Sequence, residues 1–144
     1  MQDLQVEALY SFQGGCTYSS YFLIAVKQLV CTVGHSAVVA PVYPPDKFCD
    51  FLYYCNVAVI NDTLQGADVQ TSWTVFQNKS TSYQDTKAGI SFHFRYISAE
   101  QLRKASSKLT ALTQNNIKHY GVLNVVTVSS KLEQEVDKLK DVFE

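Results

Sequence analysis

The chain has 144 residues, of which 47% are hydrophobic and 17% are charged, which is enough apolar material for one domain with a buried core. This composition excludes a disordered or low-complexity chain. Twelve Lys and Arg against thirteen Asp and Glu give a net charge of -1, and no apolar run reaches the ~20 residues of a membrane span. We therefore expect a single α/β domain over residues 1–144, with no nucleic-acid and no membrane partner.

The amino-terminal stretch has the weakest pattern. Residues 4–10 alternate as a strand would, and residues 13–20 are typical of a loop. The first ten residues carry two acids and no base, so they do not match a secretory leader. Gly14 and Gly15 lack the spacing and the lysine of a phosphate-binding loop, which favours an ordinary turn.

Two strands are predicted next, at residues 28–33 and 50–60. The stretch between residues 61 and 87 is ambiguous. Val69, Trp73 and Phe76 have helical spacing behind a possible cap at Asp68, yet residues 69–75 also alternate as a strand would. We favour the helix because Gly-Ala-Asp at 66–68 resembles a helix start.

The carboxyl-terminal half has the clearest pattern. Residues 88–97 alternate as a strand, and the pair Ser98 and Gln101 is a capping box that opens a helix ending near residues 115–116. A nearly unbroken apolar run at 121–128 predicts a strand covered on both faces. A second capping box, Ser130 with Glu133, opens a last helix that extends to Phe143.

This alternation of strands and helices predicts an α/β fold, a parallel sheet of βα units joined by right-handed crossovers. The alternative is an α+β interaction domain with an antiparallel sheet, in which residues 69–77 and 88–97 form a hairpin.

The cysteines and the sequons favour an extracellular protein. An even number of cysteines, four, permits three disulfide pairings. Asn61 and Asn78 each begin an N-glycosylation sequon in a polar stretch. We therefore expect a secreted glycoprotein with disulfides.

Leu29-Val30-Cys31, followed by the segment from Tyr43 to Tyr54, resembles the opening of the chitinase-like glycoside hydrolases of family 18. The resemblance covers residues 28–128. It implies a disulfide between Cys31 and Cys49 and a (β/α)8 barrel, the TIM barrel. Because such a barrel takes ~250 residues, this chain holds at most half of one.

The resemblance also implies a catalytic series of aspartates ending in a glutamate at the fourth strand. Residues 121–130 contain no carboxylate, and neither Thr127 nor Ser129 can act as the general acid that glycoside hydrolysis requires. We therefore expect no catalytic residue, so that the chain is either a silent relative or the amino-terminal fragment of an active hydrolase.

Other chemistry is weakly indicated. Gly34-His35-Ser36 begins like the nucleophile elbow of an esterase, but Val38 stands where the second glycine belongs. The histidines and the Cys-x5-Cys pair lack metal-ligand spacing, so we expect no metal and no cofactor. His93 and Arg95 would share a strand face, where a solvated surface is favoured over an anion site.

Ligands of parallel α/β sheets bind beyond the carboxyl ends of the strands. Those ends carry His35, Asn61, Tyr96 and Ser129, whose groups suit a neutral polar ligand such as a carbohydrate. The expectation is a non-catalytic binding or assembly protein, with open sheet edges that favour a homo-oligomer.

Overall fold

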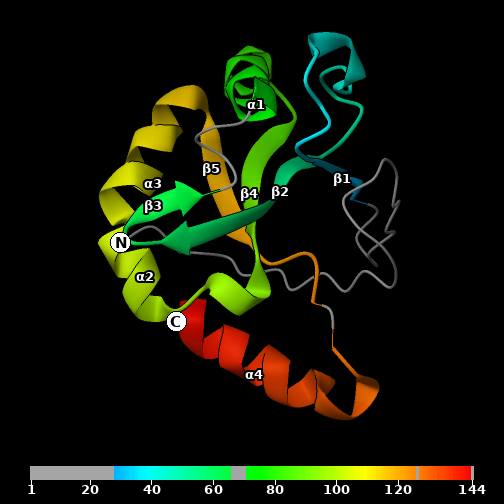
Figure 1. The fold of residues 1–144 in the computed structure, drawn as a ribbon. Helices are drawn as coiled ribbons and strands as arrows, with labels where there is room; N and C mark the ends of the chain where they lie inside the picture. Colours follow the sequence, from blue (N-terminus) through cyan, green and yellow to red (C-terminus); the bar gives the residue numbers. More distant parts are fainter. Residues whose placement is uncertain (1–27, 66–70, 126, 144) are drawn as a thin grey trace.

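Parallel strands lie side by side in the order in which they occur along the chain (Figure 1). The computed structural model describes residues 28–65, 71–125 and 127–143. The strands are β1 (Val30–Val33), β2 (Phe51–Ile60), β4 (Lys87–Phe92) and β5 (Ile117–Gly121), while β3 (Thr63–Gln65) folds back antiparallel on β2. The predicted α/β class and parallel pairing are confirmed, and the antiparallel alternative is wrong.

Helices and short 3-10 turns lie between the strands and after the last of them. The helices are α1 (Thr71–Ser82), α2 (Ala99–Lys104), α3 (Ser106–Leu112) and α4 (Leu132–Phe143), and the 3-10 turns are η1 (Ala40–Val42), η2 (Phe94–Tyr96), η3 (Thr113–Asn115) and η4 (Ser129–Lys131). Within the ambiguous stretch at 61–87, the predicted helix is therefore confirmed at 71–82, while residues 63–65 form β3. The predicted cap of α2 is also confirmed, because the Gln101 N–H donates to the Ser98 hydroxyl at 3.3 Å.

A β-bulge sets which β2 side chains face the helices. Leu52, Tyr54, Val57 and Val59 are all buried in the same core. Strict alternation along a strand cannot place Tyr54 and Val57 on one face, because they are three positions apart. The register shifts between Cys55 and Val57, and Asn56 between them has a φ of 65°. A one-residue insertion reverses the alternation, so both halves of β2 contribute to one core.

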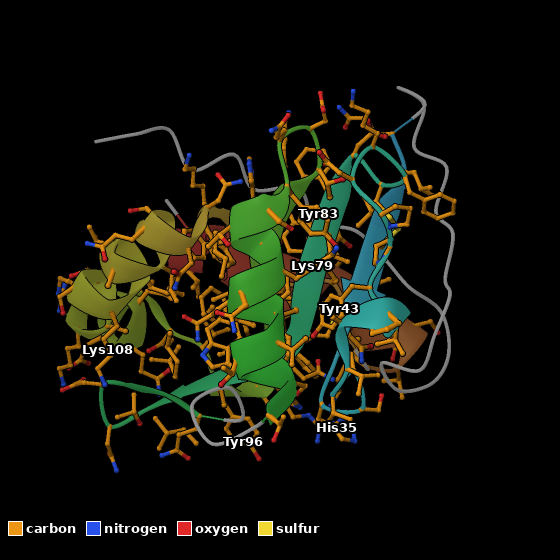
Figure 2. All side chains as sticks on the ribbon, turned by 90° about the horizontal axis from the view of Figure 1, so that it is seen from above. His35, Tyr43, Lys79, Tyr83, Tyr96 and Lys108 are labelled. Atoms are coloured by element: carbon orange, nitrogen blue, oxygen red, sulfur yellow. A yellow bond between two sulfur atoms is a disulfide. The ribbon has the colours of Figure 1, made fainter. Side chains whose placement is uncertain are left out.

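The two faces of the sheet carry separate clusters. We call the side that packs on the helices the helix face, and the opposite side the second face. The second face holds a smaller buried cluster: Val30, Phe51, Tyr53, Cys55 and Leu123. On the helix face, Trp73 and Phe76 of α1 pack on Tyr54 with ring centroids 5.1 and 5.4 Å away. Each such burial contributes about 1.5–3 kcal/mol, which fixes α1 in front of the sheet in Figure 2.

Two predicted strand boundaries are wrong. The strand expected at 88–97 ends at Phe92, which pairs with Val57, and η2 follows. The strand expected at 121–128 begins at Ile117 and ends at Gly121. Gly121 pairs with Ser91, and β4 ends one residue later at Phe92. The apolar run therefore has almost no strand left in β4 with which to pair. Leu123 instead donates its N–H to the Ser91 hydroxyl at 2.9 Å.

Ser130 lies inside η4 rather than at a helix cap, so its predicted capping role is wrong, although α4 itself is confirmed. Other expectations lie outside the described residues: the strand at 4–10, the loop at 13–20 with Cys16, and the cap at Asp68.

Candidate functional site

The carboxyl ends of the strands lie at different heights along the sheet. Val33, the last residue of β1, pairs with Tyr54, whereas β2 continues to Ile60. At about 3.3 Å per residue, Asn61 lies about 20 Å beyond the end of β1. His35 and Asn61 are therefore set well apart along the strand direction.

His35 lies in an exposed turn directly after β1. The Ala37 N–H donates to the Gly34 carbonyl at 2.9 Å, which closes an ordinary turn around His35 and Ser36. This turn leads to η1 rather than to an α-helix, so the strand-to-helix geometry of a nucleophile elbow is absent there.

Asn61 lies in the exposed two-residue turn between β2 and β3. Asn61 and Asp62 have φ values of 49° and 61°, as a tight hairpin turn requires. Asn78, which begins the second sequon, is exposed on α1. The hydroxyl of Ser80 in that sequon is buried and donates to the Phe76 carbonyl at 2.8 Å.

Tyr96 belongs to the η2 turn, which brings the side chains of residues 93–96 together directly after β4. The His93 N–H donates to the Val57 carbonyl at 2.8 Å, which fixes the turn on β2. Within the turn, the His93 Nδ1 accepts the Arg95 N–H at 3.3 Å. The Tyr96 ring lies 4.9 Å from the His93 ring, and 51% of Tyr96 is exposed.

Arg95 completes this turn. Its guanidinium lies 5.3 Å from the centre of the Phe94 ring, and the His93 ring stacks on the same phenyl group at 5.8 Å. Aromatic contacts thus restrain the side chains of the turn. We call His93, Phe94, Arg95 and Tyr96 the η2 site. The sequence had assigned His93 and Arg95 to a strand face; the structure instead groups them with Tyr96 in a turn.

Ser129 is separated from the η2 site along the chain. It is the exposed first residue of η4, eight positions after β5 ends at Gly121. Its expected place at a strand end depended on the strand at 121–128, which ends early. Figure 2 shows His35 and Tyr96 toward one end of the strands and Tyr83 toward the opposite end.

The opposite end of the strands, where β2 and β4 begin, holds an aspartate whose environment no sequence motif indicated. The Asp46 carboxylate accepts the N–H of Thr86 at 2.8 Å, that of Gln84 at 2.9 Å and that of Asp85 at 3.2 Å. These bonds hold the pKa of Asp46 well below its usual value. We call this arrangement the Asp46 clamp; it ties the β1–β2 loop to the loop before β4.

A disulfide and a tyrosine fix the same loop. Cys31 in β1 is bonded to Cys49, with Cα atoms 6.0 Å apart, which confirms the pairing that the family resemblance implied. The Tyr83 hydroxyl donates to the Pro44 carbonyl at 2.8 Å. Burial, with a smaller contribution from Asp46, raises the pKa of Tyr83 to about 12.

The described part of the chain holds no cluster of three or more His, Cys, Asp or Glu side chains that could bind a metal ion. Over residues 28–65, 71–125 and 127–143, no helix has both the length and the apolar character that crossing a membrane requires.

Comparison with known proteins gave no relative: no family model matches the chain, and neither a curated protein nor a solved structure is similar to it. The resemblance to glycoside hydrolases therefore stays a prediction from the sequence, while the parallel α/β sheet and the disulfide rest on the structure.

Proposed function

We propose that this chain is a secreted, non-catalytic carbohydrate-binding protein and that the η2 site is where the sugar binds. The observation that carries the proposal is the exposed Tyr96 ring, held against His93 just beyond the end of β4. Sugars present apolar C–H faces that pack on aromatic rings, and their hydroxyls take hydrogen bonds from neighbouring polar groups. A turn anchored on β2 restrains these groups before the ligand arrives, which lowers the entropic cost of binding.

A non-catalytic role is supported by the sequence at and after the end of β5, since residues 121–130 contain no Asp or Glu. Glycoside hydrolysis ordinarily needs two carboxyl groups on either side of the scissile bond. A chromogenic chitobioside should therefore be hydrolysed no faster than in buffer alone.

Secretion is supported by the Cys31–Cys49 disulfide, since disulfides persist in oxidising compartments. Both sequon asparagines, Asn61 and Asn78, are exposed. Because Ser80 is buried inside α1, glycosylation at Asn78 must precede the folding of that helix. A glycosidase-sensitive mass on the chain expressed through the secretory pathway would support this assignment.

The test of binding is a titration of the isotopically labelled chain with neutral and acidic oligosaccharides, followed by amide NMR shifts. We expect shifts centred on residues 93–96 and their loss in Tyr96→Ala. Tyr120→Phe is the matched control, because this tyrosine is half-buried and donates to the Leu109 carbonyl. Failure of every oligosaccharide to move these amides would contradict sugar binding at this site.

A second candidate role is that of an incomplete (β/α) barrel whose remaining strands come from another segment. The chain order of the strands favours it, because the strands of such barrels pair in chain order. The outer edges of β1 and β5 have no strand partner among the described residues.

Assembly through these edges is expected at β1 rather than at β5. The ladder of β5 is interrupted at the exposed Lys118, and a bulge together with a lysine discourages strand pairing. Light scattering over a range of concentrations should then detect dimers. A monomer mass at every concentration would contradict this role without affecting sugar binding.

A further inference from the structure

The η2 site carries one cation, the Arg95 guanidinium. Arg95 is exposed and forms no ion pair with any residue that the structure describes. The chain has only one other arginine, Arg103. A guanidinium offers five N–H donors in a planar fork that matches a carboxylate with two parallel hydrogen bonds.

The neighbouring polar groups are also donors. Since the His93 Nδ1 accepts the Arg95 N–H, a neutral His93 carries its proton on Nε2, where it is a donor. The Tyr96 hydroxyl is a further donor. The site therefore offers more donors than acceptors, which favours a ligand rich in acceptors.

A ring next to a guanidinium selects a particular kind of sugar. The rings of Tyr96 and His93 provide apolar surface for a pyranose. The His93 ring also stacks on the Phe94 ring, and the Arg95 guanidinium lies over that same phenyl group. We propose, on the basis of the function proposed above, that the η2 site recognises an acidic sugar, a uronic acid whose carboxylate pairs with the Arg95 guanidinium. The neutral sugars expected from the sequence would leave this fork without its best partner.

Two oligosaccharides of equal length separate the contribution of the carboxylates to the binding affinity from that of the rest of the sugar. Chitohexaose contains N-acetylglucosamine alone, and the hyaluronan hexasaccharide alternates that sugar with glucuronate. Calorimetry at low ionic strength should give hyaluronan an affinity about tenfold higher, as a charge-assisted hydrogen bond provides. The advantage should fall when salt is raised or when the uronates are methyl-esterified, because both weaken the ionic contact.

Variants locate this effect on the protein. Arg95→Gln should reduce hyaluronan binding to the level of chitohexaose and leave chitohexaose binding unchanged. Arg103→Gln, on the exposed side of α2, is the control and should alter neither. Tyr96→Ala should weaken both ligands, by about threefold to tenfold for the lost ring contact.

The outcomes distinguish this inference from the function on which it rests. Equal affinities for the two hexasaccharides, both lost in Tyr96→Ala, would overturn the acidic preference and keep the sugar site. A hyaluronan advantage that survives Arg95→Gln would overturn the role of Arg95. Binding of neither ligand would contradict the proposed function itself.

Discussion

Asp46 and Thr86, forty residues apart, are joined by a hydrogen bond of 2.8 Å from the Thr86 N–H to the Asp46 Oδ1. The Thr86 hydroxyl donates in turn to the Cys49 carbonyl at 2.8 Å. The loop before β2 and the loop before β4 are thus held together by polar contacts as well as by the ladder between their strands. Several backbone N–H groups would lose an acceptor if the Asp46 carboxylate were removed or neutralised.

Replacing Asp46 by Asn should lower the melting temperature and change its dependence on pH. The pKa of Asp46 is lower in the folded chain, so its stabilisation is complete above the ordinary aspartate pKa of 3.8 and is lost as the pH falls below it. Acid unfolding of the wild type should therefore be steep below pH 4 and shallower in the variant.

The control for the Asp46 clamp is Asp85→Asn. The Asp85 side chain forms an exposed ion pair with Lys47 at 3.4 Å, and such pairs contribute little to stability. Equal acid sensitivity of the wild type and Asp46→Asn would show that the clamp does not govern acid stability.

Replacing Gly89 by Ala should destabilise the sheet. A Cβ atom at this position would lie 2.6 Å from the His119 carbonyl oxygen and 2.6 Å from the Tyr53 ring, so backbone has to shift. Overpacking of this kind costs about 1–3 kcal/mol, measured as a decrease in the free energy of unfolding in urea. Lys118→Ala, which changes an exposed side chain on β5, should have an effect close to zero. A Gly89→Ala variant as stable as the wild type would contradict the close approach of Tyr53 to β4.

Alkaline conditions should destabilise the chain through the buried Tyr83 and the half-buried Tyr120. Burial raises the pKa of Tyr83 and of Tyr120 to about 12, against an ordinary value of 10.0. Their contribution to stability is complete below pH 10 and is lost as the pH rises from 10 to 12, because the unfolded chain releases these protons first. Absorbance at the phenolate band should thus show a late-titrating group of tyrosines, and Tyr83→Phe should remove one member of it. Titration of every tyrosine near pH 10 in the folded chain would be the contrary result.

Thiol titration tests the disulfide. Since Cys31 and Cys49 are bonded, the denatured, unreduced chain should expose at most two of its four thiols. Reduction should cost about 3 kcal/mol of stability, the value that loop closure gives for a separation of 18 residues. Detection of four thiols before reduction would contradict both the bond and the proposed secretion.

Local patterns predicted the elements well and their ends poorly. The helical spacing of Trp73 and Phe76 identified α1, and Ser98 with Gln101 identified the start of α2. The apolar run after Gly121 has the pattern of a buried strand, and its first residues, Val122 and Leu123, are indeed buried. They are buried in two different clusters, however, and no strand of the described residues extends far enough to pair with them. A strand ends where its partner ends, which is a property of the sheet and not of the segment.

The candidate site was predicted only in part for the same reason. Tyr96 was placed at a strand end from the alternation of residues 88–97, yet its grouping with His93 and Arg95 depends on the η2 turn. That turn arises where the Val57 carbonyl accepts the His93 N–H, a contact across strands that no local pattern records. The binding roles of His35, Asn61, Tyr96 and Ser129 stay predictions for the titrations above.

The chain-ordered sheet also has a consequence for synthesis on the ribosome. Each strand after β1 pairs with a strand made before it, so β2 finds β1 already available, β4 finds β2 and β5 finds β4. Among the described strands, none needs a later segment before it can pair with its first neighbour. Growth of the sheet can therefore proceed one unit at a time from β1 onward, and a stalled nascent chain in which Phe92 has already left the ribosome should protect the amides of β2 from exchange.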